Sequence, residues 1–248
     1  MSSKMSNIMF FDTETSGLPT RCGYDTYFPP EQIVKYNESR IVELAYIVAD
    51  PITRREIKRV RYIIKPNGEY STDKTFIYHG ISTMKAEADG RDRRLVLDEF
   101  CNDLDSVDTI IGHNIKFDYH IVASELVRSG RPNYLASKKR VCTMNMGQDV
   151  MHMAKSPKLV NLYTHLFKKP MEGAHSALGD TLATMECYYK MIHHPINLAD
   201  SNRAPEKRVG QSPIADEPIR NTVPVITEPK WTFSSHKAAL PEIYIGAS

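Results

Sequence analysis

The segment Asn7–Asp12 (NIMFFD) is an apolar run that ends in a carboxylate, and Glu14 follows two residues later. The run favours a short buried strand, and side chains two apart on a strand point to the same side. Asp12 and Glu14 therefore place two carboxylates together, which is unfavourable unless a cation neutralises them. Hard oxygen ligands favour Mg²⁺ or Mn²⁺. Taken alone, the pair also fits two exposed acids at a strand end.

The rest of the sequence predicts an α/β domain, because strands come early and helices are interleaved later. Apolar, β-branched segments predict further strands at 40–49, 58–65 and 109–112. Helical spacing of apolar residues predicts helices at 92–105, at 116–129, from Ser156 to Pro170 and at 177–193. Residues 17–39, rich in Gly, Pro, Tyr and Asn, are predicted to form a long loop.

The character of the sequence changes at Pro195, after which no periodicity is found and prolines are frequent. We predict one domain over residues 1–194 and an extended or disordered tail over 195–248. Isolated apolar groups make 231–245 a candidate docking segment, either for a replication or repair protein or for the domain itself. An inert tail is the alternative.

Composition limits the class of protein. No stretch approaches the roughly 20 apolar residues of a membrane helix, and the first residues lack a signal-peptide layout. We therefore expect an intracellular, cytoplasmic protein without membrane contact, with a nuclear location left open. Four widely spaced cysteines argue against a disulfide framework and against a cysteine zinc site. A net charge of +2 still permits a nucleic-acid enzyme, because an acidic metal site offsets basic residues elsewhere.

Two further motifs carry acidic residues. The segment 112–118 (GHNIKFD) runs from the buried strand through a loop into a helix, and Asp118 falls in the first helical turn, where a negative charge is favoured. The segment 175–180 (HSALGD) places Asp180 on a helix and His175 in the preceding loop. Histidine titrates near neutral pH, as a general base should. Each fragment by itself also fits ordinary solvated side chains.

Together, D-T-E-T-S-G-L, H-N-x-x-F-D and H-x-x-x-x-D resemble, in order, the three exonuclease motifs of the DEDDh family. These are the DnaQ-like 3′→5′ exonucleases, which include polymerase proofreading subunits, oligoribonuclease and ribonuclease T. Residues 78–82 (YHGIS) resemble the family's H-G-I segment, and 142–163 resemble the stretch before its third motif in bacterial and phage-type members. The resemblance covers about residues 7–193. A longer first loop at 19–39, the tail and the lack of a polymerase domain leave substrate and partner open.

The resemblance implies a ribonuclease H-like fold, a mixed β-sheet flanked by α-helices, with two Mg²⁺ or Mn²⁺ ions per active site. It implies that Asp12, Glu14 and Asp180 hold one ion, while Asp12 and Asp118 hold the second, Asp118 largely through water. It implies that His175 deprotonates the attacking water. The positions that resemble the family's contacts to the terminal nucleotide are Thr13, Thr15 and Leu18, with His79 and Asn114 as further candidates that equally fit structural polar groups.

The activity implied is hydrolysis of single-stranded nucleic acid, with DNA favoured, from the 3′ end to nucleoside 5′-monophosphates. The expected partners are single-stranded DNA or RNA 3′ ends. One alternative is a 3′→5′ exoribonuclease that acts on short RNA. The other is a non-catalytic module that binds a strand end or a polymerase, against which stands the presence of all five catalytic residue types.

Overall fold

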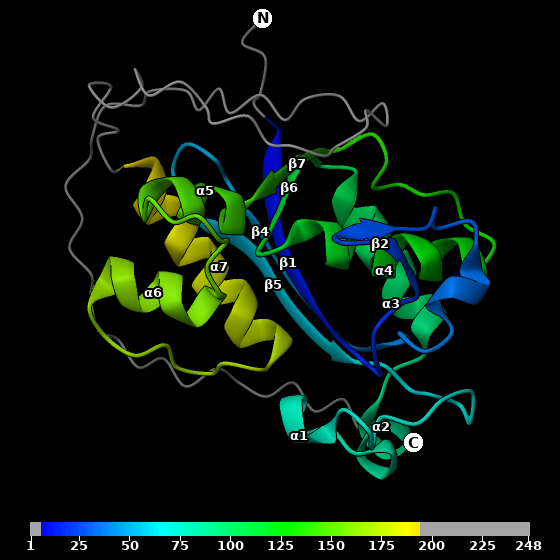
Figure 1. Cartoon of the computed structure of the whole chain (residues 1–248). Coiled ribbons are helices and arrows are strands. Elements are labelled where there is room, and N and C mark those ends of the chain that lie inside the picture. The colour runs from blue at the N-terminus through cyan, green and yellow to red at the C-terminus, as the bar shows by residue number, and fades with distance from the viewer. Residues whose placement is uncertain (1–5, 194–248) are drawn as a thin grey trace, which may run out of the picture.

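The computed structural model describes residues 6–193, in which five strands form one central sheet (Figure 1). The strand order is β5-β4-β1-β6-β7. The bounds are β1 Asn7–Thr15, β4 Ile41–Ala49, β5 Glu56–Ile63, β6 Val107–Gly112 and β7 Lys139–Cys142. The central strand β1 is antiparallel to β4 and parallel to β6, and β7 is parallel to β6. The sheet is therefore mixed, as predicted.

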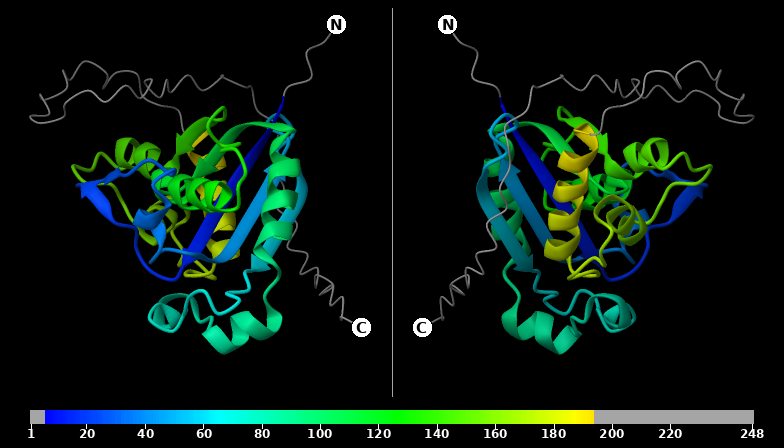
Figure 2. Two further views of the ribbon diagram at one scale, coloured as in Figure 1. Left: turned by 90° about the vertical axis from the view of Figure 1, so that its right-hand side faces the viewer. Right: turned by 90° about the vertical axis from the view of Figure 1, so that its left-hand side faces the viewer.

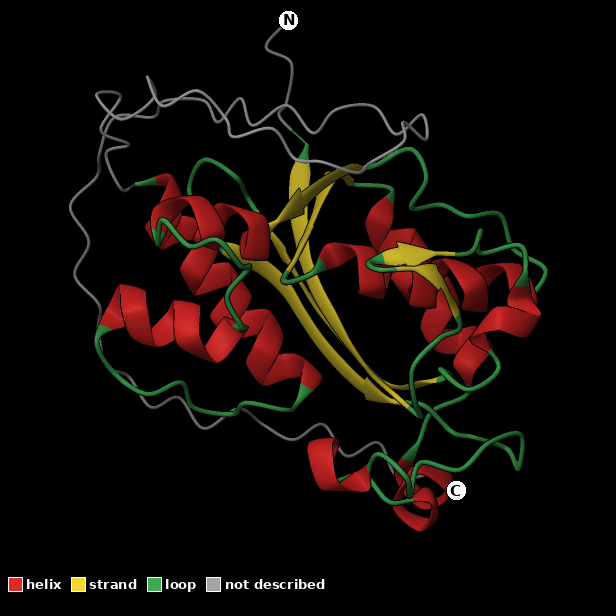
Figure 3. Ribbon diagram, viewed as in Figure 1, coloured by secondary structure: helices red, strands yellow, loops and turns green. Residues whose placement is uncertain are grey.

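Helices cover both faces of this sheet (Figure 3). On one face lie α3 (Arg93–Leu104) and α4 (Ile115–Arg128), and on the other lies α7 (Ala177–Ile192). Beside α7 pack α5 (Thr143–Val150) and α6 (Leu159–Phe167). Figure 2 shows two short helices, α1 (Phe76–His79) and α2 (Thr83–Asp89), beyond one end of the sheet. The predicted α/β class is confirmed.

Strand β1 is buried on both faces, which explains its continuous apolar run. On one face Phe10 packs edge-on against Tyr188 and Tyr189 of α7, with ring centroids 5.5 and 5.6 Å apart. On the other face Phe11 packs against Phe100 of α3. Because side chains alternate along a strand, Asp12 continues the row of Phe10. The two acidic residues of β1 therefore project on the side that α7 covers.

Most local predictions agree with the structure. The helices predicted at 92–105, 116–129 and 177–193 match α3, α4 and α7 to within one residue at each end. The helix predicted from Ser156 begins later, at Leu159, and ends at Phe167 because Lys168 adopts a left-handed conformation with φ 55°.

Several short elements differ from the predictions or were missed. The loop predicted over 17–39 contains a small hairpin of β2 (Arg21–Gly23) and β3 (Thr26–Tyr27), followed by the 3-10 helix η1 (Ile33–Tyr36). Strand β7 and helices α1, α2 and α5 were not predicted.

The predictions for the tail, including the boundary near 194 and the docking segment 231–245, lie outside the described residues. All four cysteines are free thiols, with Cys22 exposed and the other three buried. Within residues 6–193, no helix is both long enough and apolar enough to cross a membrane.

Candidate active site

Three carboxylates meet between β1 and α7. Asp12, Glu14 and Asp180 each offer one oxygen, and these oxygens all lie within 4.8 Å of one another. Asp12 and Glu14 come from the row of β1 that faces α7, and Asp180 comes from the first turn of α7. The structure therefore brings together three of the four predicted metal ligands from two separate motifs.

Asp118, the fourth predicted ligand, lies beside this group in the first turn of α4 and is 2% exposed. Its Oδ1 accepts hydrogen bonds from the backbone N–H of Thr13 at 2.9 Å and from the Thr13 hydroxyl at 2.7 Å. Thr13 thereby ties α4 to the end of β1. Asp118 is close enough to Asp12 for its charge to raise the pKa of that residue.

Burial and mutual repulsion raise the pKa of every carboxylate in the site. The pKa of Asp12 lies well above its ordinary value, because of burial first and then the charges of Asp118 and Asp180. Burial and the Asp180 charge raise the pKa of Glu14 to about 8. Burial raises the pKa of Asp118 to about 7 despite the hydrogen bonds from Thr13. Burial also raises the pKa of Asp180 to about 6, against the opposing effect of His175.

No basic side chain offsets this charge through a salt bridge found within residues 6–193. Four neighbouring carboxylates, one buried and three partly buried, need a cation if all are to be ionised near neutral pH. A donor set made of carboxylate oxygens suits a hard divalent ion such as Mg²⁺ or Mn²⁺. The residues present therefore fit the metal that the sequence motifs imply.

His175 lies in the loop before α7, exposed at the rim of the site. Its backbone is left-handed, with φ 66°. The next residue, Ser176, caps α7 by accepting a hydrogen bond from the Gly179 N–H at 3.1 Å. Position 179 requires glycine, because a Cβ there would lie 2.0 Å from the carbonyl oxygen of Gly173. This close loop explains the spacing of the third motif and keeps His175 next to Asp180 without placing it among the three carboxylates.

A pocket of about 310 Å³ opens beside Glu14. Of the predicted contacts to the terminal nucleotide, the pocket lining includes Thr13, Thr15, Leu18 and His79, but not Asn114. Two residues that sequence reasoning missed, Tyr78 and Phe117, also line it. Their signal was available, because Tyr78 precedes the H-G-I segment and Phe117 belongs to H-N-x-x-F-D.

Of the two less specific candidates, His79 makes structural contacts. The Nδ1 of His79 accepts from the Ile81 N–H at 3.1 Å, and its Nε2 lies 2.8 Å from the Thr75 hydroxyl. Both ring nitrogens thus hold α1 and the following turn at the pocket wall, and burial lowers the pKa of the ring. Asn114 adopts a left-handed conformation with φ 66° and starts α4.

Sequence reasoning also missed Glu43, a fully buried carboxylate of β4 that pairs with Glu14 across the β1–β4 ladder. The available signal was a single acid inside the otherwise apolar run Ile41–Ala49.

Comparison with known proteins agrees with this site. Residues 9–188 match the family model described as Exonuclease, and the chain belongs to this exonuclease family. Family and fold together support the DEDDh-type exonuclease family that the motifs predicted. The family depends on divalent metal ions, and the acidic cluster that such ions require is present. No match was found among curated protein sequences.

Among solved structures, the chain is similar to E. coli exonuclease I in complex with a dT13 oligonucleotide, with 20% identity and a TM-score of 0.58 over 76% of this chain and 41% of that one. It is also similar to the zinc-bound form of an E. coli exonuclease I–single-stranded DNA complex, with 20% identity and a TM-score of 0.59 over 79% and 42% of the two chains. The match therefore spans about two fifths of the length of these structures. It confirms the predicted ribonuclease H-like fold.

Proposed function

We propose that the protein hydrolyses single-stranded nucleic acid, with DNA preferred over RNA, from the 3′ end and releases nucleoside 5′-monophosphates. The observation that carries this proposal is the convergence of Asp12, Glu14 and Asp180 beside an open pocket. The exonuclease I structures similar to this chain contain a dT13 oligonucleotide or single-stranded DNA, which favours DNA as the substrate.

In this proposal Asp12, Glu14 and Asp180 would hold one Mg²⁺ or Mn²⁺ ion, and Asp12 and Asp118 would hold a second. Two such ions, when bound, lower the pKa of the attacking water and offset the charge on the leaving 3′ oxygen. Thr13 fixes the orientation of the Asp118 carboxylate through its two hydrogen bonds. The four acids reach the site from three motifs, and the first motif supports the acid of the second through Thr13.

His175 is the proposed general base. It lies close to Asp180, and its charge and its backbone N–H both act to lower the pKa of that carboxylate. It is exposed, so a proton taken from the attacking water can pass on to solvent. Its place on the loop before α7, outside the three converging carboxylates, suits a base that accepts a proton rather than a metal ligand.

The pocket is the proposed site for the terminal nucleotide. Leu18 and Tyr78 are 68% and 61% exposed, so they offer apolar surface to a base, while Thr13 and Thr15 supply polar groups. Stacking accepts every base because each has a π-face. We therefore expect digestion with little sequence preference.

A 5′-labelled single-stranded DNA oligonucleotide, incubated in Mg²⁺, tests the proposal. We expect a ladder that shortens from the 3′ end and a product that co-elutes with nucleoside 5′-monophosphates. A matched RNA degraded faster than the DNA would instead support the exoribonuclease alternative. A circular DNA cut as fast as the linear one would contradict exonuclease action.

A further inference from the structure

Glu43 is a buried acid with both carboxylate oxygens already bonded within the protein. Its side chain is 0% exposed. Oε1 accepts a hydrogen bond from the Nε of Arg61 at 2.6 Å, and Oε2 accepts one from the backbone N–H of Ala177 at 2.7 Å. In this respect Glu43 differs from Asp12 and Glu14, each of which offers an oxygen to the group of converging carboxylates.

The bond to Ala177 acts on the helix that carries Asp180. Ala177 is the first residue of α7, and the first N–H groups of a helix have no partner within the helix. Ser176 satisfies the N–H of Gly179, whereas Glu43 satisfies that of Ala177 from the neighbouring sheet. A carboxylate at this position is also favoured by the helix dipole.

The Thr181 hydroxyl, in the same turn, donates to the carbonyl oxygen of Ala177 at 2.7 Å and lies 3.4 Å from that of Ala45. The main hydrogen bond between the first turn of α7 and β4 is therefore the one from Ala177 to Glu43. Glu43 lies next to Glu14 in the β1–β4 ladder, and its charge contributes to the raised pKa of both Glu14 and Asp180. It is thus within electrostatic reach of the site.

Arg61 supplies the cation for this bond from the adjacent strand β5. Its side chain is 48% exposed, so one end of the pair reaches solvent while the carboxylate is enclosed. A buried carboxylate needs such a partner, because an uncompensated charge in the interior is strongly unfavourable.

We propose that Glu43, held by Arg61, is a positioning residue that fixes the N-terminus of α7 and so keeps Asp180 within reach of Asp12 and Glu14. The inference rests on the metal site described under Proposed function. Without Glu43 the Ala177 N–H in the first turn of α7 loses its hydrogen-bond acceptor on β4, and Asp180 is no longer held close to the two carboxylates of β1.

Two measurements on the full chain test this role without relying on catalysis. Titration calorimetry with Mn²⁺ reports the affinity of the site, and amide hydrogen exchange reports the protection of the Ala177 N–H. In Glu43→Ala we expect Mn²⁺ affinity to fall by about 10–100-fold, as for residues that support metal ligands, with faster exchange at Ala177. Glu43→Gln retains an oxygen that can accept from Ala177, so it should recover most of both properties.

Glu125→Gln is the matched control, because Glu125 is an equally buried carboxylate bonded to an arginine but does not contact α7 through any hydrogen bond found in the described residues. It should leave Mn²⁺ affinity and Ala177 exchange unchanged. If Glu43→Ala folds and binds Mn²⁺ as tightly as the unaltered protein, the positioning role of Glu43 is wrong but the proposed metal site is not affected. Absence of Mn²⁺ binding by the unaltered protein would contradict the proposed metal site itself.

If Glu43→Ala does not fold, the variant Arg61→Met tests the inference instead. Arg61 is half-exposed, and its replacement removes the positively charged partner of Glu43. We expect weaker Mn²⁺ binding and faster exchange at Ala177 in this variant. Arg61→Met with both properties unchanged would overturn the inference.

Discussion

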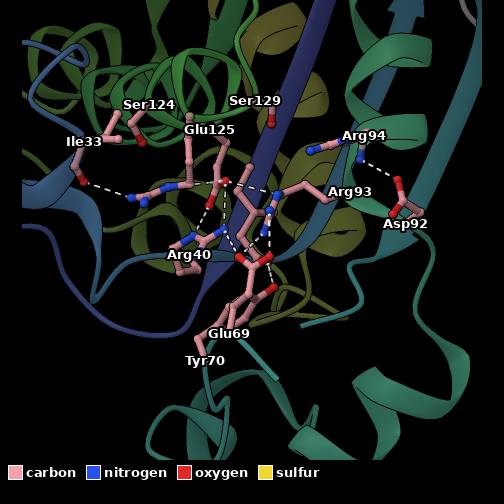
Figure 4. A network of polar contacts seen from close by, with 12 residues as sticks. Ile33, Arg40, Glu69, Tyr70, Asp92, Arg93, Arg94, Ser124, Glu125 and Ser129 are labelled. Carbon is pink, nitrogen blue, oxygen red and sulfur yellow. Dashed lines mark hydrogen bonds and ion pairs between the residues drawn. The ribbon is translucent and has the colours of Figure 1, made fainter. Parts of the chain in front are cut away.

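The molecule contains two groups of acidic side chains that are buried to different extents, and the groups differ in their partners. In the first, Glu125 is bonded to Arg40, and Glu69 is bonded to both Arg40 and Arg93, a network drawn in Figure 4. In the second, the acids of the active site surround one another, and none has a salt bridge to lysine or arginine among those found in residues 6–193.

The pKa values show what this difference means. Hydrogen bonding from Arg93 is the largest effect on Glu69 and lowers its pKa below the ordinary value. Burial and Asp180 instead raise the pKa of Glu14 to about 8. The acids of the first group are paired with arginine side chains, whereas the acids of the second group have no lysine or arginine partner in the salt bridges found within residues 6–193. A group of acids whose pKa values are raised in this way is typical of a functional site.

The largest effect is expected from Asp12→Asn, which keeps the volume of the side chain but removes its charge. Activity on labelled single-stranded DNA in Mg²⁺ should fall by about 10²–10⁴-fold. The metal-free protein should be no less stable than the unaltered one in urea unfolding, because repulsion in the group is relieved. Near-normal rates in both Asp12→Asn and Asp180→Asn would show that the converging acids are not the metal site.

Glu125→Ala makes the opposite change, because it leaves Arg40 buried with one carboxylate fewer. Breaking a buried pair by removing one partner costs about 3–5 kcal/mol, so we expect a loss of that order in the free energy of unfolding. Activity per folded molecule should stay the same. If urea unfolding showed no loss, the network would not stabilise the fold and the contrast with the active site would fail.

His175→Ala tests the step that follows metal binding. Removing the proposed base should slow release of mononucleotides by at least about 10²-fold. Calorimetric Mn²⁺ affinity should be nearly unchanged, since His175 lies outside the three converging carboxylates. A loss of Mn²⁺ affinity as large as that of Asp12→Asn would instead make His175 a ligand.

A smaller effect is expected in the pH dependence of stability in EDTA. The folded-state pKa of Glu14 is raised from 4.5 to about 8, and that of Asp118 from 3.8 to about 7. The folded protein therefore binds protons more tightly than the unfolded chain in this range. The stability that these groups contribute is fully present below the unfolded-state values and is lost as pH rises through about 7 to 8.

Thermal unfolding in EDTA should accordingly show a Tm that falls between about pH 5 and pH 8. Saturating Mn²⁺ should raise the Tm more at the upper end of this range, where the acids are ionised. Asp12→Asn should flatten the fall. A Tm in EDTA that rises over the same range would contradict the raised pKa values.

Local periodicity predicted much of this structure. The alternation of a strand was enough to place Asp12 and Glu14 on one side of β1, and helical spacing located α3, α4 and α7. These features depend on neighbours in sequence, so their signals are contained in short windows.

The missed features depend on contacts between distant residues or on very short elements. The bond from Ala177 to Glu43 spans 134 positions, and no local pattern indicates which helix end a buried acid will meet. Strand β7 has four residues, of which Lys139 and Arg140 are charged, and it is defined by pairing with β6. Helix α1, which carries Tyr78 to the pocket wall, also has only four residues and therefore shows no periodicity.

Crystals of the protein soaked in Mn²⁺, with anomalous diffraction recorded near the manganese edge, show directly whether the converging carboxylates bind metal. We expect a peak within ligand distance of Asp12, Glu14 and Asp180, and a second about 3.5–4 Å from it on the side of Asp118. We expect no peak at Glu69 or Glu125, whose charges are already paired. Absence of any peak at the three carboxylates, in crystals of protein that degrades DNA in Mn²⁺ solution, would contradict the proposed metal site.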